Sequence, residues 1–213
     1  MSVAAVIFDF NGTLSDDEPV LCEIFMHLFA EHGKPMSAQE YFDHLAGLSD
    51  PEIVTAWLGE HHPDVPTVVA ERGRRYRAAA ADGSTMHEHV REAVRFAAEH
   101  APLAICSGAA RDEIEPVIEA AEIAGCFRTV VSSDDVVHGK PDPEGYLKTL
   151  EILHADPAHA IVFEDTEAGV ASARAAGVGR VLAMRTTLEP HRLAAADELI
   201  DRLDVAVMRG LLL

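Results

Sequence analysis

The chain has little positive charge, and this excludes whole classes of partner. Its 17 Lys and Arg residues are outnumbered by 36 Asp and Glu residues, which gives a net charge of −19. Proteins bind nucleic acids and anionic membranes chiefly by neutralising phosphates with Lys and Arg. We therefore expect no nucleic acid and no membrane as a partner. A small anionic ligand is still compatible with this charge, because one or two cations or a metal ion can hold a phosphate locally.

Cysteine and long apolar runs are also scarce. Only three cysteines occur, none of them in a CxxC pair, at positions Cys22, Cys106 and Cys126. They cannot all pair, and each has apolar neighbours, so we expect buried free thiols in a reducing compartment. The first apolar stretch has no basic flank and is interrupted by Asp9, unlike a signal peptide. No uncharged apolar run approaches the roughly 20 residues of a membrane span. These absences predict a cytoplasmic protein.

The chain does contain enough apolar residues for a buried core, since 48% of its 213 residues are hydrophobic. The nearly continuous apolar run over 3–10 predicts a strand buried on both faces. Further strands are predicted over 102–106, 128–132, 160–163 and 180–184. Amphipathic helices are predicted around and between them, over 86–99, 111–123, 143–154 and 167–176. This alternation predicts an α/β fold with a doubly wound, Rossmann-like parallel sheet.

A segment of different character separates the first strand from the others. Within residues 15–83 the apolar side chains recur at helical spacing, and no convincing strand is present. Helices are predicted there over 20–29, 53–58 and 67–80. We therefore predict two parts, an all-helical insertion over 15–83 and a core formed by 1–14 and 84–213.

Polar segments follow the predicted strands where a ligand would bind, because open parallel sheets bind ligands at the carboxyl ends of their strands. These segments are 9–13, 107–108, 138–143 and 164–166. Singly, each has a purely structural explanation: Asp9 could cap a turn, and Ser107 could cap a helix. Glu164 and Asp165 could favour the positive end of the next helix. Lys140 could be an ordinary solvated lysine, although the chain has only three lysines.

Together, the four segments supply the groups that a phosphoryl-transfer site needs. The Asp9 carboxylate could attack phosphorus and form an aspartyl phosphate. The Ser107 hydroxyl and the Lys140 ammonium could spread the negative charge of the transferring group. Glu164 and Asp165 could hold Mg²⁺, a hard ion that prefers oxygen ligands. The combination predicts Mg²⁺-dependent phosphate chemistry at this edge of the sheet.

The order of four motifs resembles the haloacid dehalogenase superfamily. The motifs are DFNGTL at 9–14, CSG at 106–108, GKPDP at 139–143 and FEDTEAGVASARAAG at 163–177. Within that superfamily the chain resembles the β-phosphoglucomutase-like phosphatases, and the resemblance covers nearly the whole chain. It implies a Rossmann-like catalytic core with residues 15–83 as a helical cap.

The resemblance also implies roles for single residues. Asp9 matches the family's nucleophile. Ser107, with the backbone N–H of Gly108 beside it, matches the phosphate-binding hydroxyl. Lys140 matches the lysine that balances charge between the nucleophile and the phosphoryl group. These four positions are therefore candidates for catalysis and phosphate binding.

A metal site is implied in the same way. Asp9 matches a ligand of Mg²⁺ as well as the nucleophile, and Glu164 and Asp165 match the acidic pair that reaches the ion. Asn11 occupies the position whose backbone carbonyl usually completes the metal shell, a role that any side chain permits.

Asn11 is also a departure from the family pattern, which usually has an aspartate there as the acid to the leaving group and the base to water. An amide cannot exchange a proton at neutral pH. Losing a positioned acid/base typically lowers a rate by roughly 10²- to 10⁴-fold. We therefore expect slow hydrolysis of a small phosphorylated metabolite, with Asn11 in the catalytic position. A substitute proton carrier could come from Asp16, Asp17 or Glu18, although family members with the usual aspartate also have acidic residues there.

The insertion departs from the family pattern at two positions. Asp50 stands where the sugar-phosphate mutases place an arginine for the distal phosphate, and Leu21 stands where a histidine is common. A carboxylate at position 50 would repel a second phosphate. The sequence therefore favours a monophosphate substrate over mutase activity.

Two alternatives to a phosphatase stay open. A catalytically impaired protein that binds a phosphorylated ligand or a regulatory partner is favoured by Asn11. Retained chemistry is favoured by the intact Asp9, Ser107, Lys140 and Asp165, since a site free to drift would lose several of them. The resemblance implies the other alternative, since family members that lack this acid include hydrolases of phosphonates and of carbon–halogen bonds. The phosphonate hydrolases need a lysine in the cap, where only Lys34 occurs, and carbon–halogen hydrolysis does not suit an acidic pair of the Mg²⁺ type.

Overall fold

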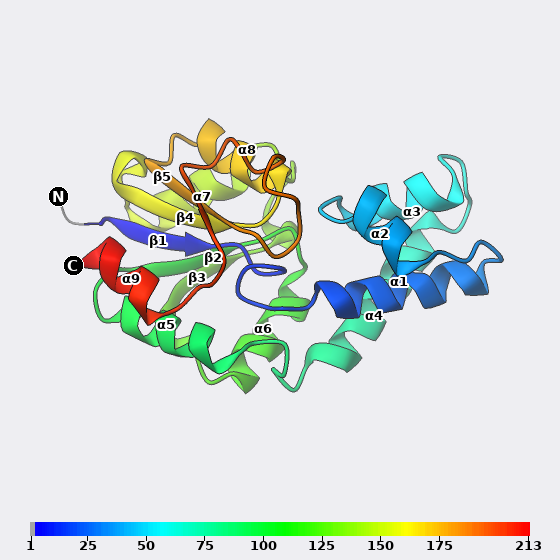
Figure 1. Cartoon of the computed structure of the whole chain (residues 1–213), viewed down its shortest axis with the longest axis horizontal. Coiled ribbons are helices and arrows are strands. Elements are labelled where there is room, and N and C mark those ends of the chain that lie inside the picture. The colour runs from blue at the N-terminus through cyan, green and yellow to red at the C-terminus, as the bar shows by residue number, and fades with distance from the viewer. Residues whose placement is uncertain (1–2) are drawn as a thin grey trace.

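A computed structural model, which describes residues 3–213, contains one six-stranded sheet (Figure 1). Its strands are all parallel and follow the order β3-β2-β1-β4-β5-β6. Their bounds are β1 Ala5–Phe8, β2 Leu103–Cys106, β3 Phe127–Val131, β4 Ala160–Glu164, β5 Arg180–Met184 and β6 Glu198–Ile200. The predicted α/β fold with a doubly wound parallel sheet is confirmed. Strand order reverses at β1, which lies between β2 and β4, and this reversal creates a crevice at the carboxyl ends of these strands.

Helices surround the sheet and also form a separate body beside it. The helices of the core are α5 Glu88–Ala98, α6 Arg111–Ala120, α7 Glu144–Leu153, α8 Glu167–Ala175 and α9 Val205–Leu212. Single turns of 3₁₀ helix occupy Ala124–Cys126, Ser133–Asp135 and Pro157–His159. The separate body consists of α1 Glu18–Glu31, α2 Ala38–His44, α3 Asp50–Leu58 and α4 Val65–Ala80. We call this body the cap; it lies on the side toward which β1 points (Figure 1).

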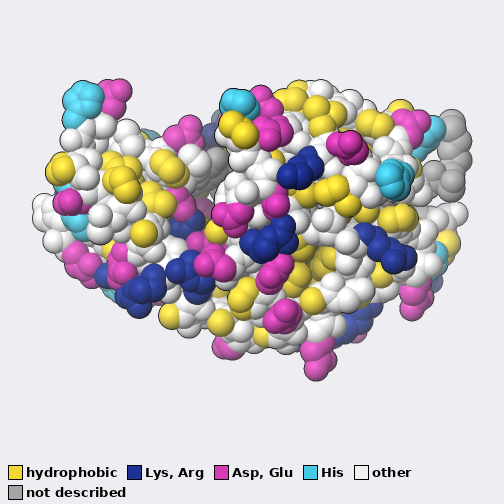
Figure 2. Space-filling view, turned by 180° about the vertical axis from the view of Figure 1, so that it is seen from behind, with side chains coloured by type: hydrophobic (Ala, Val, Ile, Leu, Met, Phe, Trp, Pro, Cys, Tyr) yellow, Lys and Arg dark blue, Asp and Glu magenta, His cyan; other side chains and the backbone are white. Residues whose placement is uncertain are grey.

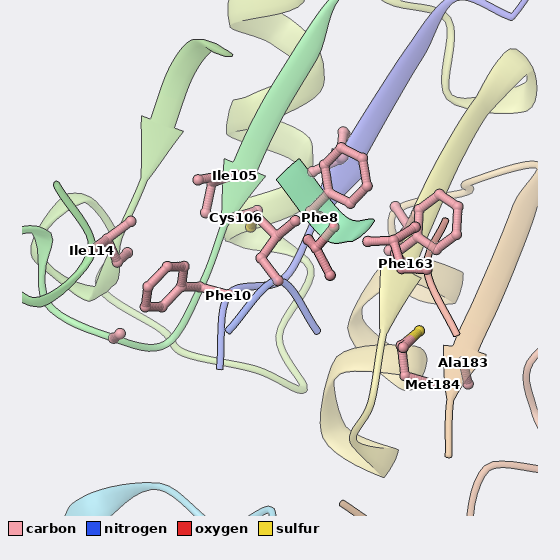
Figure 3. Close-up of a cluster of buried hydrophobic side chains, with 14 of the residues drawn as sticks. Phe8, Phe10, Ile105, Cys106, Ile114, Phe163, Ala183 and Met184 are labelled. Carbon is pink, nitrogen blue, oxygen red and sulfur yellow. The ribbon is translucent and has the colours of Figure 1, made fainter. Parts of the chain in front are cut away.

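The central strands are apolar along their whole length because helices cover both faces of the sheet. All four residues of β1 are buried, and so are all five of β4. The Phe8 ring of β1 stacks on the Phe163 ring of β4 with 5.2 Å between centroids, and Phe127 meets Phe8 edge-on at 6.3 Å. Figure 3 shows the Phe8 and Phe163 rings lying side by side. This packing fixes the ends of β1 and β4, from which site residues project.

Two segments connect the cap to the core, and they are hydrogen-bonded to each other. The Ser15 hydroxyl donates to the Thr85 hydroxyl at 2.7 Å, and the Asp16 N–H donates to the Thr85 carbonyl at 2.8 Å. The chain therefore leaves and re-enters the core at one place. None of the helices within residues 3–213 is long and apolar enough to span a membrane.

Some elements escape the sequence-based prediction. The strand β6 has only three residues, too few to show a hydrophobic pattern. The helix α2 buries only Tyr41 and so has no apolar stripe, although Ser37 and Glu40 form a capping box at its start. The terminal helix α9 is mostly apolar and lacks the polar alternation that marks a helix; the Asp204 side chain caps it. The predicted first strand, over 3–10, is longer than β1.

The aromatic stack between β1 and β4 leads to a prediction about stability. Changing Phe163→Ala should lower the free energy of unfolding by about 3–5 kcal/mol, because it removes a fully buried ring and leaves a cavity. Denaturant unfolding followed by circular dichroism measures the loss. Phe42→Ala is the matched control, since Phe42 is 39% exposed; equal losses in both variants would contradict the importance of the stack.

Candidate active site

A cavity of about 1010 Å³ lies where the cap meets the carboxyl ends of the strands. Residues from both parts of the protein line it. From the core come Asp9, Asn11, Ser107, Gly108, Lys140 and Asp165, and from the cap come Glu18, Asp50 and Arg72. The structure thus brings together all the predicted site residues except Glu164 on one cavity wall. Glu164 does not line the cavity; it lies directly behind Lys140.

Asp9 is the first residue after β1, and the structure holds it firmly. Its backbone N–H donates to the Phe163 carbonyl at 2.9 Å, which continues the pairing of β1 with β4. Burial and the nearby charge of Glu164 raise the pKa of Asp9 to about 7, against the lowering effects of Lys140 and of a hydrogen bond from Ser107. As a carboxylate, Asp9 can act as a nucleophile toward an electrophile in the cavity.

Lys140 connects the ends of three strands. Its ammonium lies 2.5 Å from Asp9 Oδ1, 2.5 Å from Glu164 Oε1 and 3.0 Å from the Cys106 carbonyl oxygen. These contacts occupy its three donors. Burial opposes the charge, but the carboxylates of Asp9 and Glu164 outweigh burial and raise the pKa of Lys140 above its usual value. Lys140 is therefore a fixed positive charge beside Asp9.

Glu164, at the end of β4, is completely buried among donors. Its Oε1 accepts from the Tyr146 hydroxyl at 2.7 Å as well as from Lys140, and its Oε2 accepts from the Asp165 N–H at 3.1 Å and the Thr166 hydroxyl at 3.2 Å. A side chain at position 169 could not coexist with this carboxylate, because a Cβ on Gly169 would lie 1.9 Å from Glu164 Cδ. The glycine of the FEDTEAG motif therefore makes room for Glu164.

Asp9, Glu164 and Asp165 offer carboxylate oxygens that all lie within 4.8 Å of one another. Burial and the charges of the other two carboxylates raise the pKa of Asp165 well above its usual value. A divalent cation would relieve this repulsion and is a natural partner for clustered oxygen ligands. The residues present therefore fit a divalent metal ion, and an ion bound here would lower these pKa values.

The Asn11 side chain is turned toward the cap. Its Nδ2 donates to Asp17 Oδ2 at 2.9 Å, and the Tyr76 hydroxyl of α4 donates to the same oxygen. The Gly12 N–H donates to Asp17 Oδ1 at 3.3 Å. Gly12 itself has a positive φ of 68°, and a Cβ there would collide with the Asp165 carboxylate. Asn11 thus has a structural role between the two parts of the protein, in addition to its place on the cavity wall.

Arg72 of α4 is a buried cation that the sequence did not indicate. Its guanidinium pairs with Glu113 of α6 at 2.8 Å and also with Asp50, the position at which the sugar-phosphate mutases have an arginine. Its Nε has no hydrogen-bond partner among the described residues. Two carboxylates thus neutralise Arg72, so this side chain adds no excess positive charge to the cap side of the cavity.

Two threonines after β5 were also missed. The Thr187 hydroxyl donates to Asp165 Oδ2, and the Thr186 hydroxyl donates to the Gly12 carbonyl at 2.5 Å. Both lie just beyond the carboxyl end of a parallel strand. The rule that identified the other four segments would have found them if it had been applied to the fifth strand.

The close approach at Gly169 gives a test of how Glu164 is held. Changing Gly169→Ala should displace the Glu164 carboxyl group and, with it, Lys140, lowering the free energy of unfolding by about 1–3 kcal/mol. Gly210→Ala in α9 is the control, because a Cβ there meets nothing within 4 Å. It should leave stability unchanged or raise it by up to about 1 kcal/mol. Thermal unfolding of both variants measures these changes. An unchanged stability of Gly169→Ala would show that the Glu164 carboxyl group can occupy another position.

Comparison with known proteins relates this geometry to a family. A family model described as haloacid dehalogenase-like hydrolase matches residues 6–183. Protein CbbY of Rhodobacter capsulatus is 31% identical over 99% of this chain and 98% of its own. The validoxylamine A 7'-phosphate phosphatase of Streptomyces hygroscopicus subsp. limoneus is 29% identical over 91% of each chain.

A solved structure agrees with these relatives. CbbY from Rhodobacter sphaeroides, in a crystal structure with xylulose-(1,5)bisphosphate, superposes with a TM-score of 0.80 and 25% identity, covering 95% of each chain. The family model alone spans most of the sequence and includes all the strand ends that line the cavity. The chain therefore belongs to the haloacid dehalogenase-like hydrolases, a family of enzymes.

Proposed function

We propose that this protein is a Mg²⁺-dependent hydrolase that removes phosphate from a small phosphorylated metabolite through an aspartyl phosphate on Asp9. The observation that carries this proposal is the position of Asp9 on the cavity wall. Its carboxylate lies 2.5 Å from the Lys140 ammonium and accepts a hydrogen bond from the Ser107 side chain. A nucleophile, a fixed cation and a hydroxyl donor on one wall are what phosphoryl transfer requires.

The proposed reaction has two steps at Asp9. The phosphoryl group of the substrate would lie against the Ser107 hydroxyl, the Gly108 N–H and the Lys140 ammonium, which stabilise its developing charge. A carboxylate oxygen of Asp9 bonds to phosphorus while the bond to the leaving oxygen breaks. Water then attacks the same phosphorus and releases phosphate and the Asp9 carboxylate. The cap excludes bulk water during the first step.

The proposed metal ligands are Asp9, Asp165, the Asn11 backbone carbonyl and Glu164. Support comes from the three carboxylates whose oxygens lie within 4.8 Å of one another. Glu164 is the most constrained of the three, because Lys140 and Tyr146 already hold its Oε1. Mg²⁺ bound here would neutralise negative charge on both the carboxylates and the phosphoryl oxygens. Its oxygen preference and its tendency to retain waters suit a site that opens on a cavity.

The proposed substrate class is a phosphate monoester with a polar body. Relatives include a phosphatase of validoxylamine A 7'-phosphate and one of phosphorylated carbohydrates from Thermotoga maritima. The ion pairs of Arg72 with Asp50 and Glu113 support a monophosphate, because they leave no free cation from Arg72 for a second phosphate. Three free cysteines, two of them buried, support action in the reducing cytoplasm.

Asn11 favours a second candidate, a phospho-ligand-binding protein with little turnover. A panel of phosphorylated metabolites distinguishes the two, with phosphate release measured in Mg²⁺ and in chelator. Metal-dependent release supports the hydrolase. Thermal stabilisation by a phosphorylated compound without any release supports the binding protein.

The nucleophile is tested directly by Asp9→Asn. This change should abolish Mg²⁺-dependent phosphate release, because an amide cannot form the aspartyl phosphate. The purified variant should keep its circular dichroism spectrum, which separates lost chemistry from lost folding. A residual rate above a tenth of the original would rule out Asp9 as the nucleophile.

Restoring the usual carboxyl group tests the effect of Asn11. We propose that turnover is slow because Asn11 provides no proton from the position at which the family usually has an aspartate, so Asn11→Asp should raise the rate on substrates with poor leaving groups at least tenfold. The comparison uses kcat on an alkyl phosphate for the original protein and the variant. An unchanged rate would mean that another residue already supplies the acid, or that the site is not built for this chemistry.

A further inference from the structure

The three acidic residues that enter the cap lie in three different environments. Asp16 is half-exposed and pairs with His87 at 2.9 Å, away from the cavity lining. Asp17 is fully buried and accepts hydrogen bonds from Tyr76, Asn11 and the Gly12 N–H. Only Glu18 lines the same cavity as Asp9. The structure therefore separates one acid facing the cavity from two that are engaged elsewhere.

Glu18 has the surroundings of a group that can hold and release a proton. It is 8% exposed, and Tyr41 of α2 donates to its Oε1 at 2.8 Å. Within residues 3–213 no other hydrogen bond reaches this carboxyl group, and no Lys, Arg or His pairs with it. Its second oxygen is thus available to a ligand in the cavity.

Burial, more than any neighbouring charge, keeps the proton affinity of Glu18 high. Burial raises its pKa to about 7, the Tyr41 hydrogen bond lowers it and the Asp17 charge raises it. Burial raises the pKa of Cys22, one turn along α1, and that of Asp165 after β4, and the charge of Glu18 adds to both shifts. A group with a pKa near neutrality can both donate and accept a proton at neutral pH.

We propose that Glu18 is the general acid and base that replaces the carboxyl group missing at position 11. This inference rests on the proposed hydrolase function and names one more catalytic residue for it. Because Glu18 stands in the first turn of α1, the cap supplies the acid to a nucleophile that belongs to the core. The arrangement also provides a proton for the leaving group that Asn11 cannot supply.

The proton balance runs through both steps. In the first, protonated Glu18 gives its proton to the leaving oxygen as the phosphorus–oxygen bond of the substrate breaks and the bond to Asp9 forms. The alcohol departs, and Glu18 is left as a carboxylate. In the second step Glu18 takes a proton from water as the water oxygen bonds to phosphorus and the bond to Asp9 breaks. Phosphate leaves, and Glu18 is again protonated.

The test compares Glu18→Gln with two substrates and two backgrounds. The glutamine keeps the shape and the hydrogen bond from Tyr41 but carries no proton to transfer. We expect kcat/KM on an alkyl phosphate, a poor leaving group, to fall at least tenfold. On 4-nitrophenyl phosphate, whose leaving group needs no acid, kcat/KM should change less than threefold. A burst of 4-nitrophenol should appear there, because hydrolysis of the aspartyl phosphate has lost its base.

The background Asn11→Asp separates catalysis from packing. With a carboxyl group restored at position 11, adding Glu18→Gln should lower the alkyl phosphate rate less than threefold. Glu23→Gln is the matched control, since Glu23 is exposed on the same helix, and it should match the original protein throughout.

Each outcome bears on one hypothesis. If Glu18→Gln slows both substrates equally, or slows the Asn11→Asp background as much as the original protein, Glu18 only positions the cap and the inference is overturned. An unchanged rate in Glu18→Gln overturns it as well. Absence of any turnover that depends on Asp9 would instead overturn the proposed hydrolase function itself, which Asp9→Asn reports separately.

Discussion

The Lys140 ammonium lies between two carboxylates, Asp9 and Glu164, which stand at the ends of the neighbouring strands β1 and β4, and its third contact reaches the end of β2 at Cys106. Buried carboxylates this close repel each other unless a cation lies between them. Removing one partner of such a buried set leaves an uncompensated charge, which destabilises a protein by about 3–5 kcal/mol. The geometry of three strand ends, and of the cavity they border, therefore depends on this one side chain.

Buried polar contacts, not only apolar packing, attach the cap to the core. Asn11 and Tyr76 converge on Asp17, and Arg72 joins α4 to Glu113 of α6. An amide nitrogen is a donor at every pH, whereas a carboxyl group at position 11 would need a proton to make the same contact with Asp17. Asn11 thus exchanges the ability to transfer a proton for a permanent hydrogen bond between the two parts.

Much of the site follows from the sequence because parallel strands end on one edge of a sheet, so residues far apart in the chain can be placed together. The direction in which each side chain points cannot be predicted from the sequence in the same way. Glu164 and Asp165 are adjacent, yet Asp165 lines the cavity while Glu164 lies behind Lys140, since neighbouring residues of an extended chain face opposite sides. Arg72 was missed because helical spacing marks a buried face without saying what it meets across the cavity. The strand β6 was too short to leave a pattern.

The strand order has a consequence for synthesis on the ribosome. The strand β1 is made first but belongs in the middle of the sheet, and its neighbour β4 begins only at residue 160. At about 5–20 residues per second, roughly 8–30 s pass before that partner is translated. During this interval the nascent chain carries an apolar segment with an unpaired edge, which is open to aggregation. All four helices of the cap have been translated by residue 80, so they can pack on one another in the meantime, beside a strand that still lacks half of its sheet.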